Sequence, residues 1–357
     1  MKMKSSVWLL LALSAVLVFQ RCSDDDEQHV RQPFDAGVLV ANEGGFQKVN
    51  ASVTFYNIEK DSATQNIFRN TAGEFAGDVL QSITIFGDHA YLVLNGSNAV
   101  EMVNAGTFDG EVTLTDKLID KPQYMEVING KAYISVWGPY DADFNLVDSY
   151  IVIADANTLT ISDTIRTEEG VSNLLYDGKY LFASNYYFGY GTSMSVIDPA
   201  KNEIVKNITV GGGPSGMVLD ANKKLWLVSR GGYGAEDGYI YRINPTTFEI
   251  EFEHHINSQP GFDLAVSPDG RKVYYSSANE VYSVALDATT GPETSLFTAE
   301  DVQDFGALGV NPTNGDIYVG DARAFATDGE VYVYSATGEL KTSFGAGVGP
   351  TQFIFRK

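Results

Sequence analysis

The chain has 357 residues, of which 44% are hydrophobic and 20% are charged, a composition that supports a large buried core and excludes an intrinsically disordered protein. Asp and Glu number 46 against 24 Lys and Arg, so the formal net charge is −22. A body this acidic repels phosphate backbones, which excludes nucleic acid as an expected partner.

The N-terminal segment has the pattern of a secretory signal. Lys2 and Lys4 precede the apolar run SSVWLLLALSAVLVF, whose 15 residues are too few to span a bilayer as a helix. We therefore expect residues 1–21 to be removed as a signal peptide. Their removal lowers the Lys and Arg count from 24 to 21 and leaves a mature net charge of −25.

The only cysteine, Cys22, directly follows this segment and precedes the acidic run SDDDE. A single cysteine excludes a disulfide within the chain and a multi-cysteine metal site. The cysteine and acidic run resemble the lipidation site and surface-export signal of Bacteroidetes lipoproteins. We therefore expect a lipidated Cys22, an acidic tether over residues 22–35, and an outer-membrane location at the cell surface with lipid as the only membrane contact. The alternative is a free cysteine at an ordinary cleavage site, because Arg21 stands where a small residue is usual.

A repeat of short strands runs through the rest of the chain. Each unit has an apolar strand, a turn rich in Asn, Asp and Gly, and a second, alternating strand, which is the pattern of a β-hairpin. A third strand, another short turn and a fourth strand follow. The hairpins are easiest to align in the segments KPQYMEVINGKAYISVWG, GVSNLLYDGKYLFASNYY, GPSGMVLDANKKLWLVSR, QPGFDLAVSPDGRKVYYSS and DFGALGVNPTNGDIYVGD.

The spacing of the repeats predicts the fold. A period of 44 to 48 residues made only of short strands is typical of a β-propeller with four-stranded blades. The C-terminal GPTQFIFRK matches only a first strand, and AGVLVANEG near the N-terminus matches a second strand. We therefore predict an all-β, seven-bladed propeller over residues 36–357, closed by the C-terminal strand joining the N-terminal blade. The repeat starts are Asp78, Pro122, Gly170, Pro214, Pro260, Asp304 and Pro350.

The loops between second and third strands should lie on one face of such a propeller, together with the connections between blades. We call this the upper face. The predicted loops are long and irregular, at 42–51, 137–149, 184–193, 230–238 and 321–330, and they carry many aromatic rings, as in SNYYFGYGTS at 184–193. Rings gathered around one mouth predict a binding surface for a broad, partly apolar ligand. The alternative is that the rings pack on one another and seal the mouth.

The predicted ligand-binding residues come from these loops and from the starts of the blades. The loop residues are Phe46, Trp137, Tyr140, Tyr186, Tyr187, Phe188, Arg230, Tyr233, Arg323 and Phe325. The blade-start residues expected at the channel mouth are Gln123, Tyr124, Asn173, Ser215, Phe262, Phe305 and Gln352. The two arginines either donate hydrogen bonds to amide or phosphate oxygens of a ligand or pair with the many carboxylates of the chain.

Few residues of the sequence point to catalysis. The chain has no GxSxG elbow, no Cys–His pair and no phosphate-binding loop, so we predict no catalytic residues, no metal and no enzymatic activity. A propeller lactonase or lyase is one alternative, with Glu43, Asn95 or Asn185 holding a calcium ion, and a scaffold for a surface glycan or another protein is a second. Four histidines occur, none in an upper loop: His29, His89, His254 and His255.

The motifs CSDDDE, INGKAYI, YDGKYLF and DGRKVYY, with the C-terminal GVGPTQFIFRK, resemble those of the YncE-like seven-bladed propeller lipoproteins of Bacteroidetes, in particular the BtuG-type surface proteins. The resemblance implies a non-catalytic protein that captures cobalamin (vitamin B12) and other corrinoids at the cell surface, with cobalamin as transported ligand and no cofactor. It also implies a TonB-dependent outer-membrane transporter as the partner that receives the ligand. A corrinoid is broad, apolar across its faces and fringed by amides, which suits aromatic rings and a few hydrogen-bonding groups.

Overall fold

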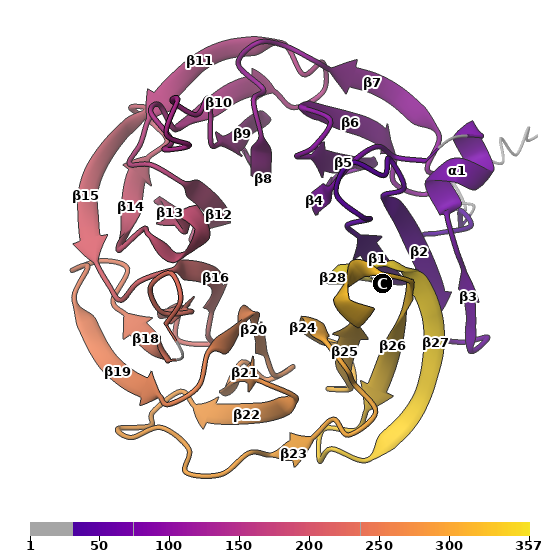
Figure 1. Ribbon diagram of the computed structural model, residues 1–357, viewed down its shortest axis with the longest axis vertical. Helices are drawn as coiled ribbons and strands as arrows, with labels where there is room; N and C mark the ends of the chain where they lie inside the picture. Colours follow the sequence, from indigo (N-terminus) through magenta and orange to yellow (C-terminus); the bar gives the residue numbers. More distant parts are fainter. Residues whose placement is uncertain (1–30, 74, 236) are drawn as a thin grey trace, which may run out of the picture. The chain divides into compact units, whose positions relative to one another are not determined.

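Four-stranded antiparallel sheets account for nearly all of the regular structure. The computed structural model describes residues 31–73, 75–235 and 237–357, and in these ranges seven such sheets form a ring of blades (Figure 1). The predicted seven-bladed propeller is therefore confirmed. The strands of each blade are given from the innermost to the outermost. Blade 1 consists of β28 (Pro350–Arg356), β1 (Gly37–Asn42), β2 (Ser52–Asn57) and β3 (Ser62–Thr64). Blade 2 consists of β4 (Leu80–Phe86), β5 (His89–Leu94), β6 (Ala99–Asn104) and β7 (Gly110–Leu114). Blade 3 consists of β8 (Pro122–Ile128), β9 (Lys131–Val136), β10 (Tyr150–Asp155) and β11 (Ile161–Arg166). Blade 4 consists of β12 (Val171–Tyr176), β13 (Leu181–Asn185), β14 (Ser193–Asp198) and β15 (Glu203–Thr209). Blade 5 consists of β16 (Pro214–Leu219), β17 (Leu225–Ser229), β18 (Gly238–Ile243) and β19 (Ile250–Ile256). Blade 6 consists of β20 (Pro260–Val266), β21 (Lys272–Ser277), β22 (Glu280–Ala285) and β23 (Phe297–Thr298). Blade 7 consists of β24 (Phe305–Val310), β25 (Ile317–Asp321), β26 (Asp328–Tyr334) and β27 (Leu340–Val348).

Blade 1 combines strands from both ends of the described chain. The C-terminal strand β28 is its innermost strand and pairs antiparallel with β1, so that Leu39 lies opposite Ile354. Beyond the sheet, the Arg356 guanidinium donates hydrogen bonds to the carbonyl oxygens of Phe34 and Ala105. This pairing confirms the predicted closure, because the ring has no blade whose inner strand is missing.

The core lies between the blades. The second strands β13, β17 and β25 are buried at every position, although an alternating pattern was expected of them. Each has a hydrogen-bonded strand on both sides and a neighbouring blade on both faces, so neither face meets water. For example, Tyr91 and Val93 on β5 belong to the same apolar cluster as Ile134 and Val136 on β9. The outer strand β11, by contrast, is largely exposed.

A bulge interrupts the pairing at the upper end of the first strand in every blade. The register slips between Pro122 and Met125 on β8 and between Pro260 and Leu264 on β20. The first strands β4, β12, β16, β24 and β28 have the same irregularity. A bulge leaves residues out of the ladder and redirects their side chains. The repeated bulge therefore presents side chains to the channel mouth on the upper face.

Polar side chains link the first strands of neighbouring blades. Backbone groups beside the channel that lack a ladder partner require another partner when they are buried. The bonds are those from the Ser82 hydroxyl to the Gln123 carbonyl oxygen (2.9 Å), from the Thr84 hydroxyl to the Met125 carbonyl oxygen (2.6 Å), from the Ser215 hydroxyl to the Phe262 carbonyl oxygen (3.1 Å), from the Ile83 N–H to Gln352 Oε1 (2.7 Å) and from the Leu308 N–H to Asp263 Oδ2 (3.1 Å).

Two elements differ from the sequence prediction. A short helix, α1 (Ile67–Ala72), lies outside the ring between blades 1 and 2 (Figure 1) and ends at Gly73, which has a left-handed φ of 81°. In blade 6 the outer strand β23 has only two residues, because the segment 286–296 takes the place of the expected tight turn and contains Pro292, which cannot donate to a strand ladder. Among the described residues, no helix is long and apolar enough to cross a membrane.

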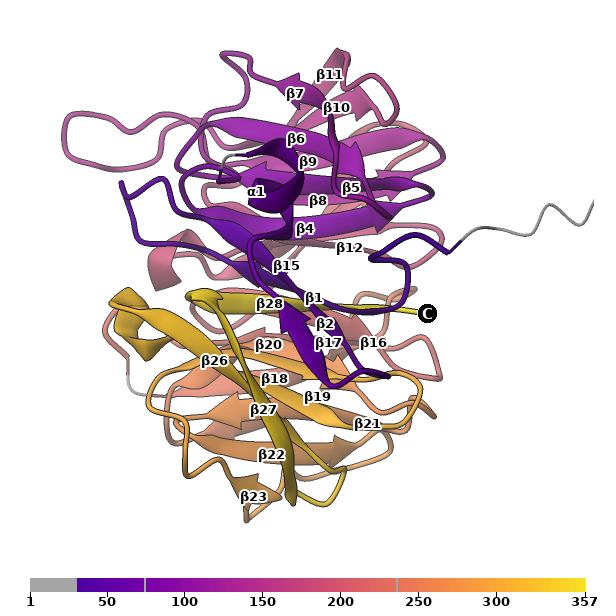
Figure 2. The ribbon, with the colours of Figure 1, turned by 90° about the vertical axis from the view of Figure 1, so that its right-hand side faces the viewer.

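The upper face lies opposite the C-terminus. Strand β28 runs from Pro350, opposite Asn42, to Arg356, opposite Gly37, so its two ends lie on the two faces of the ring. Figure 2 shows the blades edge-on, with the C-terminus on one side and the loops between second and third strands on the other. All of the long loops predicted from the sequence therefore share one face.

Candidate functional site

The upper-face loops lie where the sequence predicts them, with small changes at their ends. They cover residues 43–51, 137–149, 186–192, 230–237 and 322–327. The terminal residues of four expected segments belong to the flanking strands. Two of the loops contain a single turn of 3₁₀-helix, which is named η1 (Tyr187–Gly189) in blade 4 and η2 (Arg323–Phe325) in blade 7.

A cavity of about 240 Å³ lies at the mouth of the channel, and we call it the central aromatic cavity. Its apolar wall consists of five rings from blades 3, 4 and 6. Its polar wall consists of carboxamides, hydroxyls and one carboxylate from the bulged first strands and from the loop after β1. The rings are Tyr124, Trp137, Tyr186, Phe188 and Phe262, and the other lining residues are Glu43, Gln81, Gln123, Ser172, Asn173, Ser215 and Gly216.

A second cavity of about 460 Å³ adjoins the first, and we call it the outer aromatic cavity. The two cavities share Trp137 and Phe188, and the outer one extends to Phe46 and Tyr140. The Lys121 ammonium lies 4.8 Å from the centroid of the Tyr140 ring. Because the two spaces share two rings, one broad ligand can contact both.

Trp137 and Phe188 form the partition between the two cavities. Trp137 is only 6% exposed, and its indole N–H donates to the Ser172 hydroxyl at 3.1 Å. The Phe188 ring meets it edge to face, with the centroids 4.7 Å apart, and stays 49% exposed. The indole is therefore fixed by the fold, whereas the phenyl ring presents an open face.

Some rings of the loop 186–192 pack against neighbouring loops as a lid, and another ring forms part of the binding surface. The Tyr187 hydroxyl accepts a hydrogen bond from the Leu146 N–H at 3.0 Å, which fastens this loop to the loop of blade 3. Tyr190 stacks on Tyr233 of blade 5 at 4.9 Å, and both rings remain exposed on the rim. Phe188, between these contacts, is left facing the cavities.

Arg230 lies behind two rings of the central aromatic cavity, those of Phe262 and Tyr186, and does not line the cavity itself. Its guanidinium lies 3.5 Å from the centroid of the Phe262 ring, and its Nε donates to the Pro260 carbonyl oxygen at 2.9 Å. Nη1 lies 3.5 Å from the Tyr186 hydroxyl, which accepts from it. Burial lowers the pKa of Arg230 from its ordinary value. The sequence predicted that Arg230 either binds ligand oxygens or pairs with a carboxylate, and none of these contacts is with a carboxylate.

Two carboxyl groups near the channel mouth have raised pKa values. Burial, with the nearby charge of Asp78, raises the pKa of Glu43 to about 7. Burial also raises the pKa of Asp263 to about 7, although the hydrogen bond from the Leu308 N–H and the charge of Arg230 act in the opposite direction. The site therefore contains carboxyl groups that are partly protonated near neutral pH.

Ten of the 17 predicted residues line the two aromatic cavities. Each of the ten lies either in an upper-face loop of blade 1, 3 or 4 or in the bulge of a first strand, whose side chains point to the channel mouth. They are Phe46, Gln123, Tyr124, Trp137, Tyr140, Asn173, Tyr186, Phe188, Ser215 and Phe262.

The other predicted residues make different contacts. Tyr187, Arg230 and Tyr233 support the walls and rim as described above, and Phe305 lines a separate cavity. The Gln352 carboxamide oxygen accepts a hydrogen bond from the Ile83 N–H. In blade 7, Arg323 lies 3.4 Å from the Glu330 carboxylate, and the ring of Phe325 packs beside Gly349.

Glu43 and Gln81 line both cavities, but neither is among the ligand-binding residues predicted from the sequence. Glu43 was considered there only as a calcium ligand of the alternative enzyme. Gln81 follows Leu80, the first residue of β4, as Gln123 follows Pro122, the first residue of β8. The sequence register placed the start of this repeat two residues too early, at Asp78. An alignment on the first strand residue would have found Gln81.

Among the described residues, no group of three or more His, Cys, Asp or Glu side chains is arranged to hold a metal ion. The nearest carboxylates lie 2.8 Å from His89 Nδ1, on Glu111, and 2.7 Å from His255 Nε2, on Asp237. Cys22 and the predicted signal peptide lie outside the described residues.

Comparisons with known proteins agree with the fold. The family model described as "Domain of unknown function (DUF5074)" matches residues 36–348. Curated proteins give no match. Among solved structures, a quinonprotein alcohol dehydrogenase-like protein of Bacteroides thetaiotaomicron has 17% identity and a TM-score of 0.68, covering 91% of this chain and 79% of its own.

Two other solved structures are similar to a comparable degree. A functionally unknown protein of Desulfotomaculum acetoxidans has 10% identity and a TM-score of 0.67, covering 90% of this chain and 98% of its own. A candidate 6-phosphogluconolactonase of Bacteroides fragilis has 14% identity and a TM-score of 0.64, again covering 90% and 98%. At such identities the similarity establishes a shared fold and no shared activity.

Proposed function

The chain belongs to the DUF5074 family, and we propose that it is a non-catalytic cell-surface lipoprotein that captures cobalamin and other corrinoids on its upper face. The observation that carries the proposal is the central aromatic cavity, where five rings converge on a mouth that also has carboxamides. In this role cobalamin is the transported ligand and not a cofactor.

The two aromatic cavities suit a broad and mostly apolar ligand. Phe188 offers an open face to both, so a flat macrocycle placed across the partition contacts rings on either side. The carboxamides of Gln81, Gln123 and Asn173 lie around the central cavity and can both donate to and accept from the amides of a corrinoid. Well-buried rings of this kind usually supply most of the binding energy at an interface.

Isothermal titration with cyanocobalamin tests this proposal. We expect saturable heat with one ligand per chain and recovery of the ligand chemically unchanged. The absence of heat at micromolar protein would overturn the proposal and leave a glycan or a partner protein as the ligand class to test. The same titration with Phe188→Ala connects any heat to the proposed site.

Anchoring at the cell surface and delivery to a TonB-dependent outer-membrane transporter complete the proposal. The anchoring rests on Cys22 and the following SDDDE in the sequence, and the transporter rests on the family resemblance alone. We expect Cys22→Ala to release the protein from membranes, and replacement of Asp24, Asp25 and Asp26 by Ala to leave it anchored but facing the periplasm. Protease treatment of intact cells is the measurement, and a wild-type protein that resists it would contradict surface exposure.

Glu43 favours an enzyme as the second candidate function. A carboxyl group with a pKa of about 7 in the wall of a cavity has the properties of a general acid or base. This would suit a propeller lactonase or lyase. Assay of a lactone panel with wild type and Glu43→Gln separates the candidates: turnover that the variant loses supports the enzyme, and a wild type without turnover supports the binding protein.

A further inference from the structure

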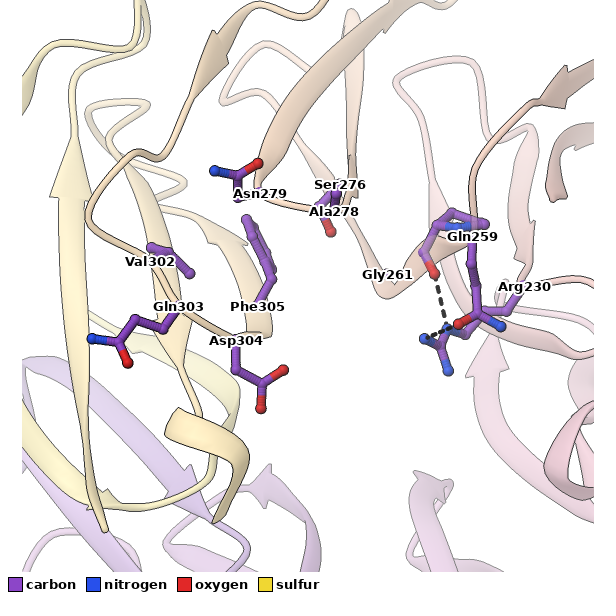
Figure 3. A pocket seen from close by; sticks show the side chains of 11 residues that line it. Arg230, Gln259, Gly261, Ser276, Ala278, Asn279, Val302, Gln303, Asp304 and Phe305 are labelled. Atoms are coloured by element: carbon purple, nitrogen blue, oxygen red, sulfur yellow. Dashed lines mark hydrogen bonds between the residues drawn. The ribbon is translucent and has the colours of Figure 1, made fainter. Parts of the chain in front are cut away.

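A third cavity on the upper face lies among blades 5, 6 and 7, and we call it the polar cavity (Figure 3). Its volume is about 420 Å³, within the range of small-molecule sites. In Figure 3, Arg230 and Gln259 lie on one side, and Gln303, Asp304 and Phe305 lie on the other. Except for Arg230 and Phe305, these residues belong to no site predicted above.

Hydrogen-bonding groups in the polar cavity are available to a ligand. Within the described part of the chain, the carboxamides of Asn279 and Gln303 have no hydrogen-bond partner, although both line the cavity. Each carboxamide offers donors and an acceptor. The Asp304 carboxylate uses Oδ2 to accept from the Ala324 N–H at 2.9 Å, which leaves Oδ1 as a further acceptor.

An aromatic ring completes the set. Phe305 lines the cavity beside Asp304, and Figure 3 shows its ring on the same side as Asn279 and Gln303. Two free carboxamides, a carboxylate and a phenyl ring match a ring with several hydroxyl groups, because hydroxyls both donate and accept and the C–H face of such a ring packs on an aromatic surface.

The charges of the cavity argue against a simple anion. Arg230 is its one cationic lining residue, and its guanidinium already contacts the Pro260 carbonyl oxygen, the Gln259 carboxamide oxygen and the Phe262 ring. Asp304 lies across the same space and would repel a phosphate or carboxylate. A neutral hydroxylated group avoids that repulsion.

Arg230 also connects the polar cavity to the central aromatic cavity. It lines the former, while Phe262 and Tyr186, which it contacts, line the latter. A ligand with an apolar body and a hydroxylated appendage could therefore occupy both spaces across this one wall.

We propose that the polar cavity binds a sugar ring, with Asn279, Gln303 and Asp304 hydrogen-bonding its hydroxyl groups and Phe305 packing on its face. The ring has two sources. One is the ribose of the nucleotide tail of a corrinoid, whose phosphate would then lie outside the polar cavity and away from Asp304, and in that case the inference rests on the proposed function. The other is a separate glycan. The chemistry of recognition is the same in both.

The experiment compares wild type with the double variant Asn279→Ala/Gln303→Ala. The probes are cyanocobalamin, cobinamide (a corrinoid without the nucleotide tail) and methyl glycosides of common hexoses, the first two by calorimetry and the last by saturation-transfer NMR. The matched control is Asn222→Ala, which removes an exposed carboxamide from a turn between β16 and β17.

If the sugar belongs to a corrinoid, wild type should bind cyanocobalamin about tenfold more tightly than cobinamide, and the double variant should lose that preference. If it belongs to a glycan, wild type should show saturation transfer to a glycoside and the double variant should not. Equal affinity of both corrinoids for wild type, with no transfer to any glycoside, overturns the inference and leaves the proposed function standing. Failure of both corrinoids to bind overturns the proposed function, and the glycoside arm then decides the inference alone.

Discussion

Phe188 shows how single residues shape the binding surface. Its backbone has a left-handed φ of 50°, which non-glycine residues rarely adopt. Such a conformation persists only when its surroundings hold it, and here Tyr187 is fastened to Leu146 on one side. On the other side the chain turns back so closely that a Cβ on Gly191 would lie 1.6 Å from the Asn185 carbonyl oxygen. The loop thereby keeps one ring open at the mouth.

Replacing Phe188 by Ala should weaken cobalamin binding at least about tenfold, or ~1.4 kcal/mol, since a ligand across the two cavities would bury this exposed ring and a few buried rings usually supply most of the binding energy. Phe86→Ala is the control, because Phe86 is 40% exposed against 49% for Phe188 and lies at the opposite end of a first strand. Calorimetry should show unchanged affinity for the control. An affinity of Phe188→Ala within about threefold of wild type would mean that the rings of this loop serve as a lid.

Glu43 should make stability depend on pH. Its pKa rises from an ordinary 4.5 to about 7 in the folded protein, so between these values the folded state holds a proton that the unfolded state has released. The free energy of unfolding should therefore fall as pH rises from 4.5 to 7 and level off above. Chemical denaturation of wild type and Glu43→Gln should give equal stability near pH 4 and a more stable variant, by on the order of 1 kcal/mol, at pH 8. Parallel pH profiles for the two proteins would show that folding leaves the pKa of Glu43 unchanged.

At the scale of the strand, the bulge repeated in all seven blades positions the site. In a regular strand, alternate side chains would point into the neighbouring blades and be used in packing. The bulge between Pro122 and Met125 instead frees Gln123 and Tyr124, both of which line the central aromatic cavity. The same device in blade 6 places Phe262 there. Site residues thus come from strand starts as well as from loops.

Gln352 illustrates the bonds that hold these strand starts together, and Gln352→Ala should destabilise the fold. The substitution removes the acceptor of the Ile83 N–H, and an unpaired buried N–H costs about 1–3 kcal/mol. Urea denaturation is the measurement. Gln303→Ala is the control, because that exposed carboxamide has no partner within the described residues and its loss should leave stability unchanged. Equal stability of the two variants would show that water replaces the Gln352 oxygen.

At the scale of the whole molecule, closure depends on one strand. Because β28 pairs with β1 and Arg356 bonds to backbone carbonyls of residues 34 and 105, the last residues of the chain hold the first blade in the ring. An open ring would leave β1 without its inner partner and expose an edge that recruits other chains.

Deletion of residues 349–357 should therefore abolish cooperative unfolding and promote aggregation. Differential scanning calorimetry and light scattering measure the two effects. Deletion of Lys357 alone is the control, since this residue lies after the last residue of β28 and outside the sheet. A truncated protein with the wild-type melting profile would disprove closure by the C-terminal strand.

The number of blades and their closure can be predicted from the sequence alone, because the turns that separate short strands depend on local residues and recur at a regular spacing. It also identified the upper loops and all seven of the rings that line the two aromatic cavities. The short helix α1 and the two-residue strand β23 could not be read from that repeat, since each is a local departure from it.

Which candidate residues are free to bind depends on contacts between blades, and the repeat does not reveal those contacts. Trp137 and Phe188 have similar surroundings in the sequence, yet the first is buried and hydrogen-bonded while the second is half exposed. Gln352 lies two residues after the repeat start Pro350, and Gln303 lies one residue before the repeat start Asp304. Yet Gln352 accepts a hydrogen bond from a backbone N–H, whereas the Gln303 carboxamide has no partner in the described chain. Exposure and hydrogen bonding depend on contacts between blades, which join distant residues such as Ile83 and Gln352, 269 positions apart, whereas the repeat that reveals the fold is local.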